Sequence, residues 1–200
     1  MLQVRLSWQV VISLTDSMKA QAAGRLERLR DAAAENGIRT FLVRDTASIE
    51  WLTAFDDVFD DEQAHALLVT PHDAVLHTDS RYSGAARKAA QGEGVIAVDD
   101  ARQGHGEWVA DVFARRHANA PAGSPAPESI VLGIEDSMTL AAFRALEGAL
   151  AKAPASPQLR ETSDFVRMLR AVKEPSEVAR MKAAQAITDA AFSYIVTYMK

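Results

Sequence analysis

The sequence predicts an α/β fold in which a mixed β-sheet is flanked by helices and followed by a long C-terminal linker helix. Short apolar runs typical of strands alternate with amphipathic stretches that have the three-and-four spacing of helices. Two of the strands are separated only by turn residues, which favours an antiparallel hairpin. Alternating strands and helices otherwise favour parallel pairing, so the sheet is expected to be mixed.

The first regular stretch begins at Met18. Its apolar helix face consists of Ala22, Leu26, Leu29 and Ala33. The helix is expected to end at Asn36 and Gly37, because both residues tolerate the left-handed cap conformation. A strand follows at 38–43, then "TASIEWLTAF" predicts a second short helix or turn, and "DDVFDDEQ" predicts an acidic loop.

The predicted hairpin pairs strands 66–70 and 74–78 around Pro71, His72 and Asp73. The rest of the domain is expected to contain a helix in "SRYSGAARKAAQGEG", a strand at 95–98, a helix in "GEWVADVFARRH", a strand in "IVLGIED" and a helix in "SMTLAAFRALEGAL". In the last of these helices the residues expected to face inward are Leu140, Phe143, Leu146 and Leu150. Pro-rich connectors separate the later elements.

The closing stretch from Pro175 to Lys200 predicts a long helix. Glu174 and Pro175 are typical of a helix start, and Glu177 adds negative charge at the positive end of the helix dipole. No stop signal follows, although the final turns carry an apolar load of Phe192, Tyr194, Ile195, Val196, Tyr198 and Met199. We expect this apolar face to pack against a partner.

These elements divide the chain into three parts. Residues 1–17 are an unassigned N-terminal extension, residues 18–160 form the α/β domain, and residues 161–200 form linker helices. The extension contains an apolar run, but polar residues interrupt it and it lacks a small-x-small cleavage site, so an export signal is not expected.

The composition narrows the class of protein. At 48% hydrophobic residues, the 200-residue chain can bury a substantial core. A net charge of −5, with scattered basic residues, argues against nucleic acid and anionic membranes as partners, and no stretch approaches the ~20 apolar residues of a membrane span. The chain has no cysteine, which excludes disulfides and thiol chemistry and fits a cytoplasmic location.

The histidines and the acidic loop are the first candidates for a metal site. His65, His72 and His77 are close in sequence but fall on a turn and on two strands without a shared face, so core or solvated histidines are favoured. The acidic cluster consists of Asp56, Asp57, Asp60, Asp61 and Glu62. It lacks the alternating ligands and the central glycine of a calcium loop, so a solvated loop is favoured.

Three further motifs have simple structural interpretations. Gly92–Gly94 and Gly104–Gly106 are glycine pairs without the order of a dinucleotide fingerprint, and they are interpreted as ordinary turns. In "TDSRY", Asp79 or Ser80 can cap the following helix, with Arg81 and Tyr82 in its first turn. A capping and packing role is favoured there over a binding cluster.

Several stretches together resemble the N-terminal domain of the pita-bread family of Xaa-Pro aminopeptidases, prolidases and creatinases. They are "RLERLRDAAAENGIRTFLV", "SIEWLTAF", "LHTDSRY", "LGIEDSMTL" and "LRAVKEPSEVARMKAA", between about Arg25 and Thr188. The matching family motifs, interpreted as structural, are Asp79, Arg81 and Tyr82 and, further on, Arg170, Lys173 and Glu177. Trp51 stands where the family usually has tyrosine, and Ala54 where it usually has glycine.

The resemblance implies a mixed sheet flanked by helices and a separate catalytic domain beyond Lys200. In the family, the peptidases bind two divalent metals, manganese, cobalt or zinc, with two Asp, one His and two Glu, and creatinases keep the fold without metals. None of these ligands has a counterpart here, so no catalytic residue, metal or cofactor is expected in this chain. Met18 lies where such domains usually start, which leaves Met1 or Met18 as the start site.

The resemblance implies an accessory role in a proline-specific metallopeptidase that acts on proline-containing peptides. The expected partners are further copies, as a homo-oligomer, or the missing catalytic domain. The loop from Phe55 to Gln63 is expected to gate a neighbouring active site, with Asp56 and Asp57 most exposed, although a solvated loop is the simpler interpretation. The chain is then a fragment or truncated product. The alternative is a free-standing module that self-associates or caps a full-length relative, and an enzyme with unrecognised chemistry is the third hypothesis.

Overall fold

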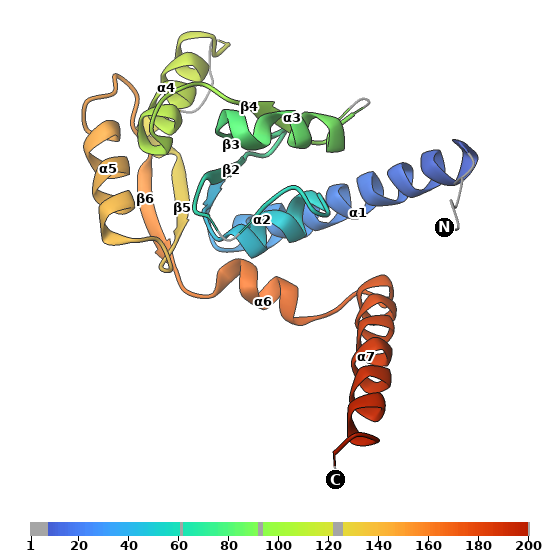
Figure 1. Cartoon of the computed structure of the whole chain (residues 1–200). Coiled ribbons are helices and arrows are strands. Elements are labelled where there is room, and N and C mark those ends of the chain that lie inside the picture. Colours follow the sequence, from blue (N-terminus) through green and yellow to red (C-terminus); the bar gives the residue numbers. More distant parts are fainter. Residues whose placement is uncertain (1–7, 61, 92–93, 122–125, 200) are drawn as a thin grey trace. The chain divides into compact units, whose positions relative to one another are not determined.

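The computed structural model describes residues 8–60, 62–91, 94–121 and 126–199, with the backbone alone for 8–17 and Pro127. The described residues form two compact units, divided between Val166 and Arg167. The first unit contains the sheet and most of the helices, and the second contains the long C-terminal helix (Figure 1).

The first unit is built on a six-stranded mixed sheet, as predicted. Its strands are β1 (Thr40–Val43), β2 (His65–Val69), β3 (Ala74–Thr78), β4 (Ala97–Asp99), β5 (Val131–Glu135) and β6 (Gln158–Thr162). The spatial order is β4-β3-β2-β1-β5-β6. Strand β2 runs antiparallel to both of its neighbours, β1 and β3, and the β2–β3 pair is the predicted hairpin. The other three pairs, β3–β4, β1–β5 and β5–β6, are parallel.

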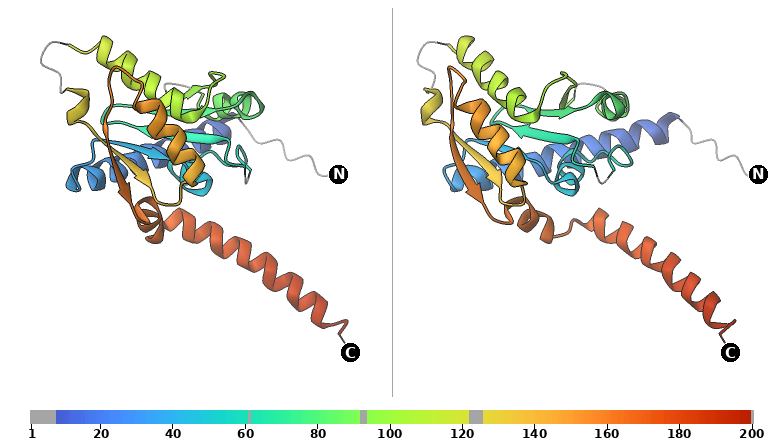
Figure 2. Two further views of the ribbon diagram at one scale, coloured as in Figure 1. Left: turned by 90° about the vertical axis from the view of Figure 1, so that its left-hand side faces the viewer. Right: turned by 60° about the vertical axis from the view of Figure 1, so that its left-hand side comes forward.

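Helices cover both faces of this sheet (Figure 2). The helices are α1 (Trp8–Glu35), α2 (Thr46–Thr53), α3 (Ser80–Ala89), α4 (His105–Ala118), the 3₁₀ turn η1 (Pro127–Ser129), α5 (Leu140–Leu150), α6 (Phe165–Ala171) and α7 (Pro175–Val196). On one face, α4 and α5 pack over a core that includes Leu42, Leu68, Leu132, Ile134, Trp108 and Leu146. On the other face, α1 packs against β1 and α2.

The end of α1 forms as the sequence predicts. Gly37 has a φ of 66°, its N–H donates to the Ala34 carbonyl at 2.9 Å, and the Ile38 N–H donates to the Ala33 carbonyl at 2.8 Å. These two bonds are the Schellman pattern that satisfies the last carbonyls of a helix. The beginning differs from the expectation, because α1 starts at Trp8, ten residues before Met18.

Three local predictions are wrong. The strand β6 was missed because Gln158–Thr162 is a polar edge strand without a fully buried side chain. Leu140 does not face inward. It is 61% exposed because it is the first residue of α5, next to the N-cap Thr139, whereas the buried residues of this helix, Leu146 and Leu150, lie in its second half. The motif Gly104–Gly106 is the start of α4 and not a turn.

The helix α7 starts as predicted. Pro175 is its first residue, and the Glu174 N–H donates to the Glu177 carboxylate at 2.8 Å. No residue described in α7 is buried, and the exposed fraction is 73% at Ile187 and 67% at Phe192. Within the described ranges, none of the helices is long and apolar enough to cross a membrane.

Candidate functional site

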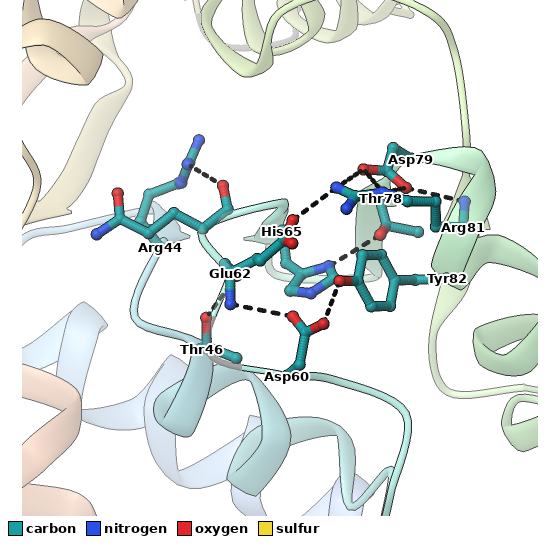
Figure 3. A network of polar contacts seen from close by, with 10 residues as sticks. Arg44, Thr46, Asp60, Glu62, His65, Thr78, Asp79, Arg81 and Tyr82 are labelled. Carbon is teal, nitrogen blue, oxygen red and sulfur yellow. Dashed lines mark hydrogen bonds and ion pairs between the residues drawn. The ribbon is translucent and has the colours of Figure 1, made fainter.

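The strongest polar cluster lies where β3 leads into α3. Asp79 caps α3 by accepting the Arg81 N–H at 2.9 Å, which confirms the predicted capping role. The Arg81 guanidinium is shared between two carboxylates, at 2.7 Å from Asp79 and 2.7 Å from Glu62 (Figure 3). The Tyr82 hydroxyl donates to the Asp60 carboxylate at 2.5 Å. The motif therefore fastens the acidic loop to the start of α3.

The hydrogen bonds that hold the acidic loop shift the pKa values of the groups in the cluster. The hydrogen bond from Tyr82 lowers the pKa of the Asp60 carboxyl, and the same bond raises the pKa of Tyr82 to about 12. The hydrogen bonds to Asp79 and Glu62 raise the pKa of Arg81. With these shifts Asp60 and Arg81 stay charged and Tyr82 stays neutral at neutral pH, so the cluster holds the loop by charge-assisted hydrogen bonds.

The acidic loop is less freely solvated than the sequence predicted. Asp60 and Glu62 are held by α3, whereas Asp56 and Asp57 are exposed, as expected for the gating candidates. Asp57 has a φ of 58°, in the left-handed region. Asp61 and the Gly92–Gly94 motif, of which only Gly94 is described, lie wholly or partly outside the described residues.

A buried histidine supports the loop from below. His65 is fully buried in β2, and its Nδ1 is 2.8 Å from the Thr78 hydroxyl directly across the hairpin. Its ring lies between Phe59 of the loop and Tyr82 of α3, with ring centroids 4.6 Å away on each side. The buried Nε2 has no hydrogen-bond partner among the described residues. Burial lowers the pKa of His65, so the imidazole is neutral and acts mainly as a packing element.

A pair of histidines, His77 and His105, lies on the face of the sheet opposite to His65. The Nδ1 atoms of His77 and His105 are 2.7 Å apart, and the His77 Nε2 is 3.0 Å from the Ala101 carbonyl. Because that carbonyl can only accept, His77 carries its proton on Nε2 and His105 donates from Nδ1. His77 stacks on Trp108, whose indole N–H donates to Asp99 at 2.9 Å. Burial lowers the pKa of His105 to about 3.

Arg44 and Glu135 link the loop to the centre of the sheet. The buried Glu135 carboxylate accepts the backbone N–H groups of Arg44 and Asp45 at 2.6 and 2.9 Å. The Arg44 guanidinium donates to the Gln63 carbonyl at 3.1 Å, at the end of the acidic loop. Burial lowers the pKa of Arg44, and the Glu135 charge opposes that shift. Sequence reasoning missed Glu135 and Arg44, because their partners are distant in sequence, whereas His65 is one of the histidines for which a core or solvated position was favoured.

The second family motif lies in the C-terminal part of the chain. The Lys173 ammonium donates to the carbonyls of Arg170 and Ala171 at 2.8 and 3.4 Å, at the end of α6. Glu177 completes the start of α7. Each contact satisfies a backbone group at a helix end, which is what a structural motif does at a junction between helices.

The histidine and carboxylate side chains that the structure describes are not gathered as a set of metal ligands. The three histidines named as metal candidates are apart, because His65 and His77 face opposite sides of the sheet and His72 is exposed in the hairpin turn. Among the described residues there is no group of three or more His, Cys, Asp or Glu side chains that could hold a metal ion. The carboxylates of the polar cluster are already bonded to Arg81 and Tyr82.

Comparison with solved structures agrees with this architecture. The Xaa-Pro dipeptidase from Bacillus anthracis is 28% identical, with a TM-score of 0.66, and the match covers 90% of this chain and 44% of that one. The X-Pro aminopeptidase from Thermotoga maritima is 22% identical, with a TM-score of 0.63, covering 88% and 44%. A Xaa-Pro aminopeptidase structure from Streptococcus pyogenes is 23% identical, with a TM-score of 0.57, covering 75% and 98%.

The chain thus spans less than half the length of the first two of these proteins. No curated protein matches it. The family model described as the creatinase/prolidase N-terminal domain matches residues 25–172, which is well over half of the sequence. The match includes the strands of the sheet, the acidic loop and the Asp79, Arg81 and Tyr82 motif. The chain therefore belongs to the creatinase/prolidase N-terminal domain family.

Proposed function

We propose that this domain is the non-catalytic, oligomerising and substrate-gating part of a proline-specific metallopeptidase of the Xaa-Pro aminopeptidase or dipeptidase type. The observation that carries the proposal is the anchored acidic loop. Asp60 and Glu62 are fixed by Tyr82 and Arg81, so the exposed carboxylates of the loop project from a supported base. A loop held in this way can restrict the space above a neighbouring active site.

The catalytic chemistry is assigned to a separate domain with two divalent metals, manganese, cobalt or zinc. The acidic groups of the cluster in this chain are committed to structural bonds, as at Asp79, which both caps α3 and pairs with Arg81. The gating role requires a neighbouring subunit, so a homo-oligomer is part of the proposal. We also propose a cytoplasmic location, which fits the absence of cysteine from the sequence.

The catalytic assignment is tested with the purified chain. Incubated with manganese and Xaa-Pro dipeptides or tripeptides, it should release no amino acid, and calorimetric titration with manganese should show no stoichiometric binding. Metal-dependent hydrolysis by this chain would refute the proposal.

The gating role is tested in a chimera in which this domain replaces the matching part of the Bacillus anthracis Xaa-Pro dipeptidase. Changing Asp56→Ser and Asp57→Ser should alter the ratio of kcat/KM for longer and shorter substrates about twofold to fivefold, the effect of an exposed charge interaction. Asp31→Ser with Glu35→Ser, on the exposed surface of α1, is the matched control. Equal ratios in both variants would exclude gating by the loop.

A second candidate function rests on α7. Several large apolar side chains of this helix are exposed, including Met181, Ile187, Phe192, Tyr194, Ile195 and Tyr198. Such a surface suits a free-standing interaction module that self-associates or caps a full-length relative. Sedimentation of a variant with Ile187→Ser and Phe192→Ser tests this candidate, which predicts that the variant loses an association seen in the native chain.

A further inference from the structure

A groove of about 640 Å³ runs between α4 and α5 on the outer face of the first unit. The two helices lie side by side (Figure 2). They approach closely at Gly106, where an added Cβ atom would lie 2.8 Å from the Leu146 backbone nitrogen. Small side chains, including Ala110, Ala145 and Ala149, line the groove, so another helix could come near its floor.

The two sides of the groove carry opposite charges. The acidic row is Glu107 and Asp111 on α4, and the basic row is Arg144 on α5 and Lys152 just after it. All four side chains are exposed, and none of them makes a hydrogen bond or ion pair with another described residue.

This charge pattern is complementary to itself. A two-fold axis that runs parallel to the groove, in the plane of the interface, places α4 of one copy over the α5 side of the other, and the reverse. Glu107 and Asp111 then face the partner copy's basic row, while Arg144 and Lys152 face its acidic row. A purely acidic or purely basic partner would neutralise only one row, whereas a second copy neutralises both.

We propose that the α4–α5 groove is the surface on which a second copy of this chain docks. The inference rests on the oligomerising role proposed above and names its surface. With 14 residues in α4 and 11 in α5, the two-helix face measures about 20 by 20 Å, or about 400 Å² per copy. The total, about 800 Å², is below the ~1,200 Å² of stable specific interfaces, so the dimer is a weak, reversible one that dissociates further at high salt.

The test is sedimentation velocity of the full chain at low salt, up to about 200 µM because interfaces of this size are weak. The native chain should form a dimer. One variant carries Glu107→Lys and Asp111→Lys, and a second carries Arg144→Glu and Lys152→Glu. Each variant alone presents rows of like charge to its own copy, and its association should weaken at least about tenfold. An equimolar mixture of the two variants should associate at least as tightly as the native chain.

Two controls separate docking through the groove from the effects of net charge and of misfolding. Asp31→Lys with Glu35→Lys on α1 changes the net charge by the same amount as the first groove variant but leaves the groove intact, so its dimer should persist. Circular dichroism checks that each variant is folded. A native chain that stays monomeric, or groove variants that dimerise normally, would overturn the inference.

The failure of this inference can be distinguished from that of the proposed function. If the α7 variant with Ile187→Ser and Phe192→Ser is monomeric while the groove variants still dimerise, the groove is refuted and oligomerisation through α7 remains. If the groove variants behave as expected but the purified chain hydrolyses Xaa-Pro peptides, the groove stands and the non-catalytic assignment fails.

Discussion

Ala54 is the position at which replacing alanine by glycine should cost the domain almost nothing. It is the C-cap of α2, with φ 53° and ψ 30°, and it stands where the resembling family usually has glycine. A side chain in this left-handed conformation costs about 1–2 kcal/mol, which glycine avoids. The acidic loop begins directly after this residue, so the strained cap also sets the direction in which the loop leaves α2.

The magnitude follows from three opposing effects at Ala54. The residue is 5% exposed, so deleting its methyl group costs about 0.8 kcal/mol of burial. The greater freedom of glycine in the unfolded chain costs about 0.7 kcal/mol, and relief of the left-handed strain returns about 1.5 kcal/mol. The free energy of unfolding of Ala54→Gly should therefore stay within about 0.5 kcal/mol of the native value.

The matched control is Ala22→Gly. Ala22 is 3% exposed and lies well inside α1, so the same methyl group is lost without any relief of strain. Burial and helix propensity together predict a loss of about 1.7 kcal/mol. Urea unfolding of the native chain and both variants in one buffer measures the difference. An equal loss of stability in the two variants would refute the reasoning about Ala54.

Three further predictions concern the core and its histidines. Gly133→Ala should lower the free energy of unfolding by about 1–3 kcal/mol in urea titrations, because the new Cβ would lie 2.7 Å from a ring carbon of Phe41. Burial depresses the pKa of His105 to about 3, so its contribution to stability is complete above the unfolded value of about 6.5 and is lost as the pH falls toward 3. Between pH 7.5 and 5.5 the loss is about 1.4 kcal/mol, which His105→Asn should remove from the pH dependence of urea unfolding; an unchanged dependence would contradict this. Trp108→Phe should lower the thermal midpoint by about 2–8 °C, because it deletes the 2.9 Å, part-buried hydrogen bond from the buried Trp108 to Asp99, and an unchanged midpoint would argue against that bond.

Elements whose signals are local could be predicted from the sequence. The start of α7 at Pro175 and the end of α1 at Gly37 each depend on a few neighbouring residues that bond to one another. The hairpin was predictable because its turn residues stand between two apolar runs, and the structure pairs Val69 with Ala74 directly across that turn. Such signals need no knowledge of the rest of the fold.

Elements that depend on distant neighbours could not be predicted. Strand β6 is polar, and only its parallel pairing with β5 makes it a strand. Leu140 has the right spacing to face inward, but the spacing does not reveal that the first turn of α5 contains no buried residue. The pairing of β6 and the exposure of Leu140 are both set by tertiary context and not by the local sequence pattern.

The candidate site divides in the same way. The cap at Asp79 was visible in the motif, whereas Asp60 and Glu62 were interpreted as solvated because their partners lie about twenty residues away. One signal could have placed His65. If the hairpin turns at 70–73, counting outward from Val69 and Ala74 sets His65 opposite Thr78, and this is the pair that the structure shows.

The register of the β2–β3 hairpin places the supports of the two proposed roles, docking and gating, on opposite faces of the sheet. Consecutive residues of a strand point to opposite faces, so His77 contacts α4 while Thr78 meets His65 below the acidic loop. A slip of one residue between β2 and β3 would exchange these faces. His77 would lose the stacking and pairing that fix the start of α4 beside the groove, and the loop would lose its buried support. The same five-residue strand therefore fixes both the surface proposed for docking and the base of the loop proposed for gating.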